Sequence, residues 1–230
     1  MRIPSVLTLF ALLMAGTSGC QPESAAPVVT APEQVATATE EGFVPLFDGK
    51  SLAGWQGRTE DYEAVDGMLV CKAGCRGNLY TERQYSDFVL RLEYRVGPGG
   101  NNGVGIRAAI GKENPASTGM EIQILDDDAP KYAKLKPEQY TGSIYSAVAA
   151  KRGYTRPPGE WNAMEIRAEG PNIRVTLNGT VIVDADMDKV GPIRIRDHWA
   201  EGLHNKSGYI ALCGHKDRVE FRNMEIKELK

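Results

Sequence analysis

The sequence predicts an all-β domain that is a sandwich of two packed antiparallel sheets. Short segments with strand-like alternation follow one another from residue 62 onward and are separated by Gly, Pro, Asn and Asp. No segment of the domain keeps the period of a long amphipathic helix, so helical crossovers between strands are not expected. Strands in this arrangement are typical of sandwiches and jelly rolls, whose curved sheets leave a concave face for ligands.

The predicted strands, in chain order, are Tyr62–Val65, Met68–Lys72, Asp87–Val96, Val104–Ala109, Met120–Leu125, Trp161–Glu169, Asn172–Leu177, Val181–Ala185, Gly208–Cys213 and Val219–Leu229. Alternation is clearest in residues 88–96, where the apolar side chains share one face of the strand. Asn178-Gly179 predicts a two-residue hairpin, because this pair tolerates the positive φ angles of a type I′ turn. The segment Tyr132–Tyr140 is a candidate for one short helix, interrupted by Pro137.

The beginning of the chain is typical of a targeting segment. A basic start, an apolar run to residue 15 and small residues at 16–19 precede Cys20. The apolar run is shorter than the roughly 20 residues that a membrane-spanning helix needs. We expect residues 1–19 to be a lipoprotein signal peptide and Cys20 to be the lipid anchor; an ordinary signal peptide with a chance cysteine is the alternative. The protein would then lie in the cell envelope outside the cytoplasm, at the periplasmic face or the outer membrane, with the anchor as its only membrane contact.

Residues 20–42 are expected to be a flexible tether, because they are rich in Ala, Pro, Thr, Val and Glu and cannot bury much apolar surface. Residues 43–230 then form the jelly-roll domain, a length that suits one folded unit. The net charge of −3 is dispersed along the chain without a basic run. This pattern argues against a nucleic-acid partner and suits an uncharged ligand such as a sugar.

Setting Cys20 aside leaves Cys71, Cys75 and Cys213, which allow at most one disulfide and a free thiol. Cys71 with Cys75 is one possible pair. A zinc site is not expected, because no second pair of cysteines or histidines accompanies them.

Several segments together resemble the 3-keto-disaccharide hydrolase family. They include 45–55 (PLFDGKSLAGW), 101–107 (NNGVGIR), 119–126 (GMEIQILD) and 220–227 (EFRNMEIK). Each segment is weak alone, but their order over nearly all of 43–230 is specific. Two positions depart from the family pattern: Ala53 where Asp is frequent, and Cys213 where Gln is common.

The resemblance implies a concanavalin-like jelly roll and an enzyme that cleaves the glycosidic bond of 3-keto-glycosides or 3-keto-disaccharides, as a hydrolase or a lyase. A non-catalytic carbohydrate-binding module and a conventional glycosidase are the alternatives. The implied partner is an oxidised sugar, and the oligomeric state stays open. No cofactor is predicted, although the acidic run Asp126–Asp128 would suit calcium if it is not a solvated turn.

Glu121 and Gln123 are the first candidate site residues. On a strand, Ile122 and Ile124 would point to the core and turn Glu121 and Gln123 to the opposite face, where they could hold sugar hydroxyls. A solvated outer face is the alternative. A retaining glycosidase needs two carboxyl groups about 5 Å apart, and this strand does not supply a second one, so a mechanism with a single base is expected.

His215 and Glu121 are predicted as the acid and the base, in either order, with Arg107 stabilising the enolate formed from a 3-keto sugar. For Arg107 the alternative is a surface salt bridge. Tyr145 and Trp55 are predicted stacking platforms for a sugar ring, although aromatic residues more often fill the core.

Overall fold

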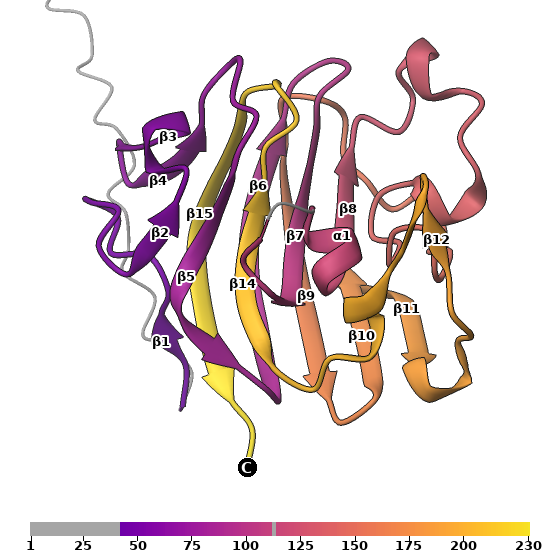
Figure 1. The fold of residues 1–230 in the computed structure, drawn as a ribbon. Helices are drawn as coiled ribbons and strands as arrows, with labels where there is room; N and C mark the ends of the chain where they lie inside the picture. Colours follow the sequence, from indigo (N-terminus) through magenta and orange to yellow (C-terminus); the bar gives the residue numbers. More distant parts are fainter. Residues whose placement is uncertain (1–41, 112–113) are drawn as a thin grey trace, which may run out of the picture. The chain divides into compact units, whose positions relative to one another are not determined.

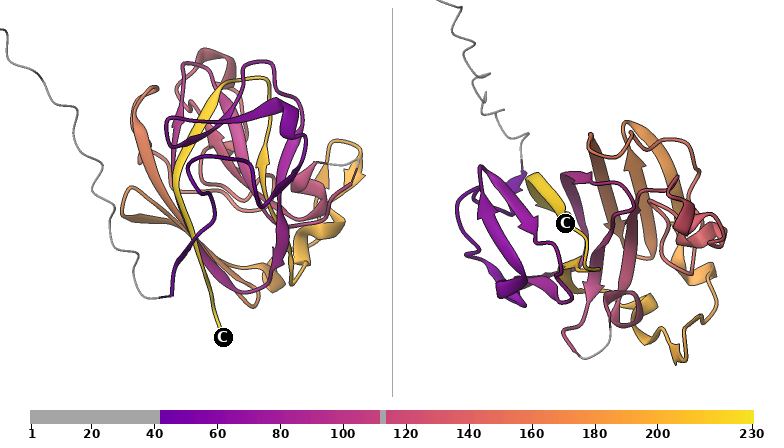
Figure 2. Two further views of the ribbon diagram at one scale, coloured as in Figure 1. Left: turned by 90° about the vertical axis from the view of Figure 1, so that its left-hand side faces the viewer. Right: turned by 90° about the horizontal axis from the view of Figure 1, so that it is seen from above.

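Two antiparallel sheets pack against each other in the computed structural model, which describes residues 42–111 and 114–230 (Figures 1 and 2). The all-β prediction is therefore confirmed. The predicted signal peptide, the lipid anchor and nearly all of the tether lie outside the described residues. Within those residues, no helix has the length and apolar character needed to cross a membrane.

The larger sheet has eight strands in the order β11-β10-β9-β6-β15-β4-β3, with β1 beside β15. Their bounds are β1 Val44–Pro45, β3 Tyr62–Val65, β4 Met68–Cys71, β6 Phe88–Val96, β9 Trp161–Glu169, β10 Asn172–Leu177, β11 Thr180–Asp186 and β15 Val219–Glu228.

The smaller sheet has five strands in the order β2-β5-β14-β7-β8 and carries the candidate site. Its members are β2 Trp55–Gly57, β5 Asn78–Tyr85, β7 Asn101–Ala108, β8 Met120–Leu125 and β14 Gly208–Cys213. We call the face of this sheet that points away from the larger sheet the outer face.

The remaining elements are short. Strands β12 Arg194–Ile195 and β13 His198–Trp199 form a separate two-stranded hairpin. The other elements are the one-turn helix α1 Pro115–Thr118 and five 3₁₀ turns: η1 Thr59–Asp61, η2 Pro130–Tyr132, η3 Pro137–Gln139, η4 Met187–Lys189 and η5 Glu201–His204. The predicted helix over Tyr132–Tyr140 is wrong, because Pro130 and Pro137 each begin a separate 3₁₀ turn in this region.

The core lies between the two sheets and follows the predicted alternation. On β6, Phe88, Leu90 and Tyr94 are fully buried, while Arg91 and Glu93 on the other face are only half-buried. The hairpin between β10 and β11 also forms as expected, because Asn178 and Gly179 have φ angles of 48° and 84°. The period-two pattern thus fixes which side chains face the core and which face outward.

Candidate active site on the outer face of the five-stranded sheet

Glu121 and Gln123 lie on the outer face of β8, as predicted. Ile122 and Ile124 between and after them are fully buried in the core. Glu121 is only 4% exposed and Gln123 only 3%. The alternative of a solvated outer face is therefore wrong, because both polar side chains are covered.

The neighbouring strand β7 makes room for the Glu121 carboxylate. Gly105 pairs with Glu121, and Gly103 pairs with Gln123. A Cβ atom built on Gly103 would lie 2.1 Å from Glu121 Oε1, which no side chain could tolerate. The amide of Gln123 donates from Nε2 to Asn101 Oδ1 at 2.9 Å, so its orientation is fixed.

His215 reaches the same place from the end of β14. Ile210 and Leu212 are buried in the core, and the chain after them brings His215 Nε2 to 3.5 Å from Glu121 Oε1. That oxygen is buried and makes no hydrogen bond within the described part of the chain. The imidazole is about one-third exposed, so the pair joins a covered carboxylate to a group at the surface.

Cys213 lies beside this pair as a free, fully buried thiol. Burial, followed by the charge of Glu121 and a hydrogen bond donated to that carboxylate, raises the pKa of Cys213 well above its usual value. The group therefore stays a thiol near neutral pH and acts as a hydrogen-bond donor rather than as a nucleophile.

The other two described cysteines form a disulfide next to the His215 loop. Cys71 ends β4 and is bonded to Cys75, with Cα atoms 6.4 Å apart. Gly74 N donates to Lys216 O at 2.7 Å, and Lys216 N donates to Cys75 O at 2.6 Å. The short disulfide loop thus holds the residue that follows His215 in place.

Tyr145 lies opposite Glu121, in a segment that pairs with the edge of β8. Ile144 bridges Ile122, and Tyr145 N donates to Glu121 O at 2.8 Å. Its phenol oxygen accepts from Gln139 Nε2 at 2.9 Å. The register therefore places Tyr145 beside Glu121, where a half-buried ring can contact a bound sugar.

Trp55 does not join this group. It is 4% exposed, packs in the core, and belongs to β2 at the opposite edge of the sheet from β8. The prediction that Trp55 is a stacking platform is wrong, because the ring fills the core instead.

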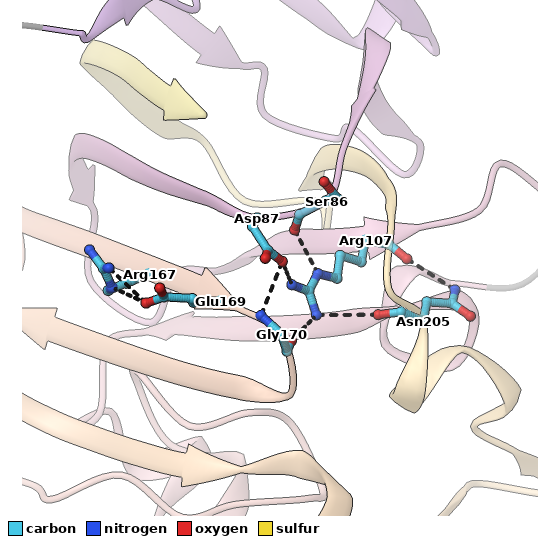
Figure 3. Close-up of polar contacts among 7 residues, drawn as sticks. All are labelled: Ser86, Asp87, Arg107, Arg167, Glu169, Gly170 and Asn205. Atoms are coloured by element: carbon cyan, nitrogen blue, oxygen red, sulfur yellow. Dashed lines mark hydrogen bonds and ion pairs between the residues drawn. The ribbon is translucent and has the colours of Figure 1, made fainter. Parts of the chain in front are cut away.

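Arg107 is also held elsewhere (Figure 3). In the pairing of β7 with β14, Gly105 faces Ala211 but Ala108 faces Tyr209, so the strand bulges between them. Arg107 lies in this bulge with φ 48° and is 3% exposed. The extra residue interrupts the alternation, and the prediction that Arg107 points away from the core is wrong.

The guanidinium of Arg107 joins the ends of both sheets. It donates to Ser86 O at 2.9 Å, to Gly170 O at 2.7 Å and to Asp87 Oδ1 at 2.9 Å. Burial lowers the pKa of Arg107, and the charge of Asp87 opposes this effect. These contacts describe a structural clamp, not a group free to meet an enolate.

Sequence reasoning missed Tyr80, which shares the outer face with Glu121. Tyr80 pairs with Ala211, Ala211 pairs with Gly105, and Gly105 pairs with Glu121, so small residues separate the phenol from the carboxylate. Burial raises the pKa of Tyr80, and the charge of Glu121 adds to this. The phenol therefore stays protonated and can donate a hydrogen bond. Alternation in β5 extends only over Asn78, Leu79 and Tyr80, which is too short a signal to identify it from the sequence.

The acidic run after β8 braces loops. Asp126 Oδ2 accepts from Gly99 N at 2.7 Å, and Asp127 Oδ1 accepts from Thr141 Oγ1 at 2.7 Å. The described residues contain no cluster of three or more His, Cys, Asp or Glu side chains arranged to hold a metal ion.

Residues 42–227 match the family described as the 3-keto-alpha-glucoside-1,2-lyase-like domain. A 3-keto-disaccharide hydrolase of Bacteroides thetaiotaomicron is 25% identical, with 82% of this chain and 79% of the relative aligned. A crystal structure of a candidate glycosyl hydrolase from Parabacteroides distasonis superposes with a TM-score of 0.71 at 32% identity, covering 81% of this chain and 99% of that protein. The carbohydrate-binding module CBM66 from Bacillus subtilis shares the fold, with a TM-score of 0.50 at 13% identity over 76% of this chain and 96% of the module. The chain therefore belongs to the 3-keto-alpha-glucoside-1,2-lyase-like family, a family of carbohydrate hydrolases.

Proposed function

We propose that the protein cleaves the glycosidic bond of 3-keto-glycosides or 3-keto-disaccharides, with Glu121 as the base and His215 as the acid. The observation that supports this most directly is the buried Oε1 of Glu121, which lacks a hydrogen bond within the described residues and lies 3.5 Å from His215 Nε2. A buried acceptor without a hydrogen-bond donor costs free energy. Accepting a proton from the substrate would give this carboxylate oxygen a partner.

The order of proton transfers follows from the exposure of the two groups. The ketone at carbon 3 acidifies the hydrogen on carbon 2, and Glu121 removes this proton while the bonding electrons move to the ketone oxygen as an enediolate. The electrons then return, the bond from carbon 1 to the leaving oxygen breaks, and His215 at the surface protonates that oxygen. In a hydrolase, water then adds across the new double bond.

The enediolate oxygen needs a donor, and Tyr80 replaces Arg107 in this role. The phenol stays protonated because burial raises its pKa, and it lies on the same face as Glu121. Gln123, with its amide fixed by Asn101, and Tyr145 would contact sugar hydroxyls. A donor aimed at the position where charge develops contributes most to lowering the barrier.

The test compares 3-keto-trehalose with unoxidised trehalose in the wild type and in Glu121→Gln. General acid–base catalysis typically contributes about 10²–10⁴-fold, so kcat on the oxidised sugar should fall by that order while binding survives. Glu165→Gln, on β9 of the other sheet, is the matched control and should keep wild-type turnover. In deuterated solvent, unreacted 3-keto-trehalose should gain deuterium at carbon 2.

Three outcomes would contradict the proposal. Near-normal turnover by Glu121→Gln would show that Glu121 is not the base. Equal cleavage of trehalose would indicate a conventional glycosidase. Binding of both sugars without cleavage of either would indicate a carbohydrate-binding module.

A further inference from the structure

A cleft opens between α1 and the β12–β13 hairpin. It encloses about 680 Å³ and its lining includes Ser117, Thr118, Asp197, Trp199 and Glu201. We call it the hairpin cleft. Figure 1 shows α1 in front of β7 and β8, and β12 to the right of β8. Glu121, Gln123 and His215 do not line it, so it is separate from the proposed catalytic pair.

Trp199 gives this cleft an aromatic wall. At 56% exposed, it is the most exposed of the large apolar side chains in the described residues. The guanidinium of Arg194 lies 5.5 Å from the ring centroid, which restrains the ring. An exposed, oriented indole beside a polar cleft has the geometry for stacking against the apolar face of a ring.

Three polar side chains of the cleft are unused. Among residues 42–111 and 114–230, the side chains of Asp197, His198 and Glu201 make no hydrogen bond or ion pair. The guanidinium of Arg194 donates to the backbone oxygen of Asp197 at 2.8 Å and to neither carboxylate, so the two carboxylates keep their charge and would repel an anionic ligand. They are good acceptors for the hydroxyl groups of an uncharged one.

The wall of the cleft is held rigidly. Asn205 Nδ2 donates to Arg107 O at 3.0 Å and to Thr118 O at 2.9 Å. A Cβ atom on Gly202 would lie 2.0 Å from the backbone of Thr118, so the two segments are in close contact. Preorganised walls lower the ordering cost of binding a ligand.

The hairpin cleft is within reach of Glu121. Thr118 lines the cleft and precedes Glu121 by three residues, which corresponds to roughly 10 Å along an extended chain. Pro115 of α1 also packs against Gly105, whose Cβ atom would lie 2.7 Å from it, and Gly105 is the partner of Glu121. One substrate molecule could therefore contact both places.

We propose that the hairpin cleft binds an uncharged pyranose ring, with Trp199 as the stacking platform and Asp197 and Glu201 accepting from its hydroxyls. On the proposed function, this ring is the unoxidised unit of a 3-keto-disaccharide. The cleft thus selects disaccharides over glycosides with a small leaving group.

The binding test uses the full chain with ¹⁵N-labelled tryptophan, whose three indole N–H groups give separate NMR signals. Titration with methyl α-glucoside should move the Trp199 signal saturably and leave those of Trp55 and Trp161 in place. Trp199→Ala should abolish saturable binding. Methyl α-glucuronide should bind more weakly, because its carboxylate meets Asp197 and Glu201.

Glu121→Gln should keep this binding, which separates a failure of the cleft from a failure of the catalytic proposal. In kinetics, Trp199→Ala should raise KM for 3-keto-trehalose by roughly three- to tenfold, as expected for loss of one aromatic contact, with kcat unchanged. KM for methyl 3-keto-glucoside should not change. A Trp199 signal that does not move with glucoside, or equal binding of the glucuronide, would overturn the proposal.

Discussion

Replacing Arg107 by Met separates a structural role from a catalytic one. Met keeps much of the length of the side chain but removes every donor to Ser86 O, Gly170 O, Asn205 O and Asp87. Breaking a buried ion pair costs about 3–5 kcal/mol. Asp87 is 39% exposed and regains water, so we expect a loss of about 2–4 kcal/mol in the free energy of unfolding.

A domain of this size loses about 2–4 °C of Tm per kcal/mol, so Arg107→Met should unfold roughly 4–16 °C below the wild type. The assay is thermal unfolding followed by circular dichroism, with turnover measured well below the new Tm. Arg83→Met is the matched control, since Arg83 is 66% exposed in its ion pair with Glu228, and its Tm should stay unchanged. An unchanged Tm in Arg107→Met with a large loss of turnover would refute the clamp and restore a catalytic role.

Two glycine-to-alanine substitutions test the effect of an added methyl group, one at a crowded position beside Glu121 and one at an open position in a turn. Gly103→Ala should abolish most turnover in a folded protein, because the new methyl group would lie 2.1 Å from Glu121 Oε1 and displace it; wild-type turnover would show that the carboxylate position is not needed. Gly179→Ala meets no atom within 4 Å but keeps φ 84°, so it should cost about 1 kcal/mol of stability by chemical denaturation and leave turnover intact. A loss of turnover there would show that the hairpin affects the site.

The outward direction of Glu121 and His215, the proposed catalytic pair, was predictable because it follows from strand period. Ile122 and Ile124 fix the direction of Glu121, and Ile210 and Leu212 fix the direction of the chain that leads to His215. Alternation specifies a face without knowledge of the partner strand. Alternation within each strand cannot show that β8 and β14 lie in the same sheet; the structure shows this.

The sequence misplaced Arg107 and missed Tyr80, for different reasons. The bulge at Arg107 exists only in the pairing with β14, so it cannot be read from β7 alone. The strand β5 that carries Tyr80 has three consecutive buried residues, Leu79–Thr81, followed by three exposed ones, a pattern that hides its period. Trp55 belongs to a three-residue strand, too short for any pattern.

Through the Cys71–Cys75 disulfide, the redox state of the surroundings affects how firmly the proposed acid, His215, is held. Its loop holds Lys216 through both backbone groups, one residue beyond His215. Disulfides persist where thiols are oxidised and open where they are kept reduced. We therefore expect reduction of this disulfide to loosen the imidazole of His215, so that the proposed acid would be held in place only while the bond is oxidised.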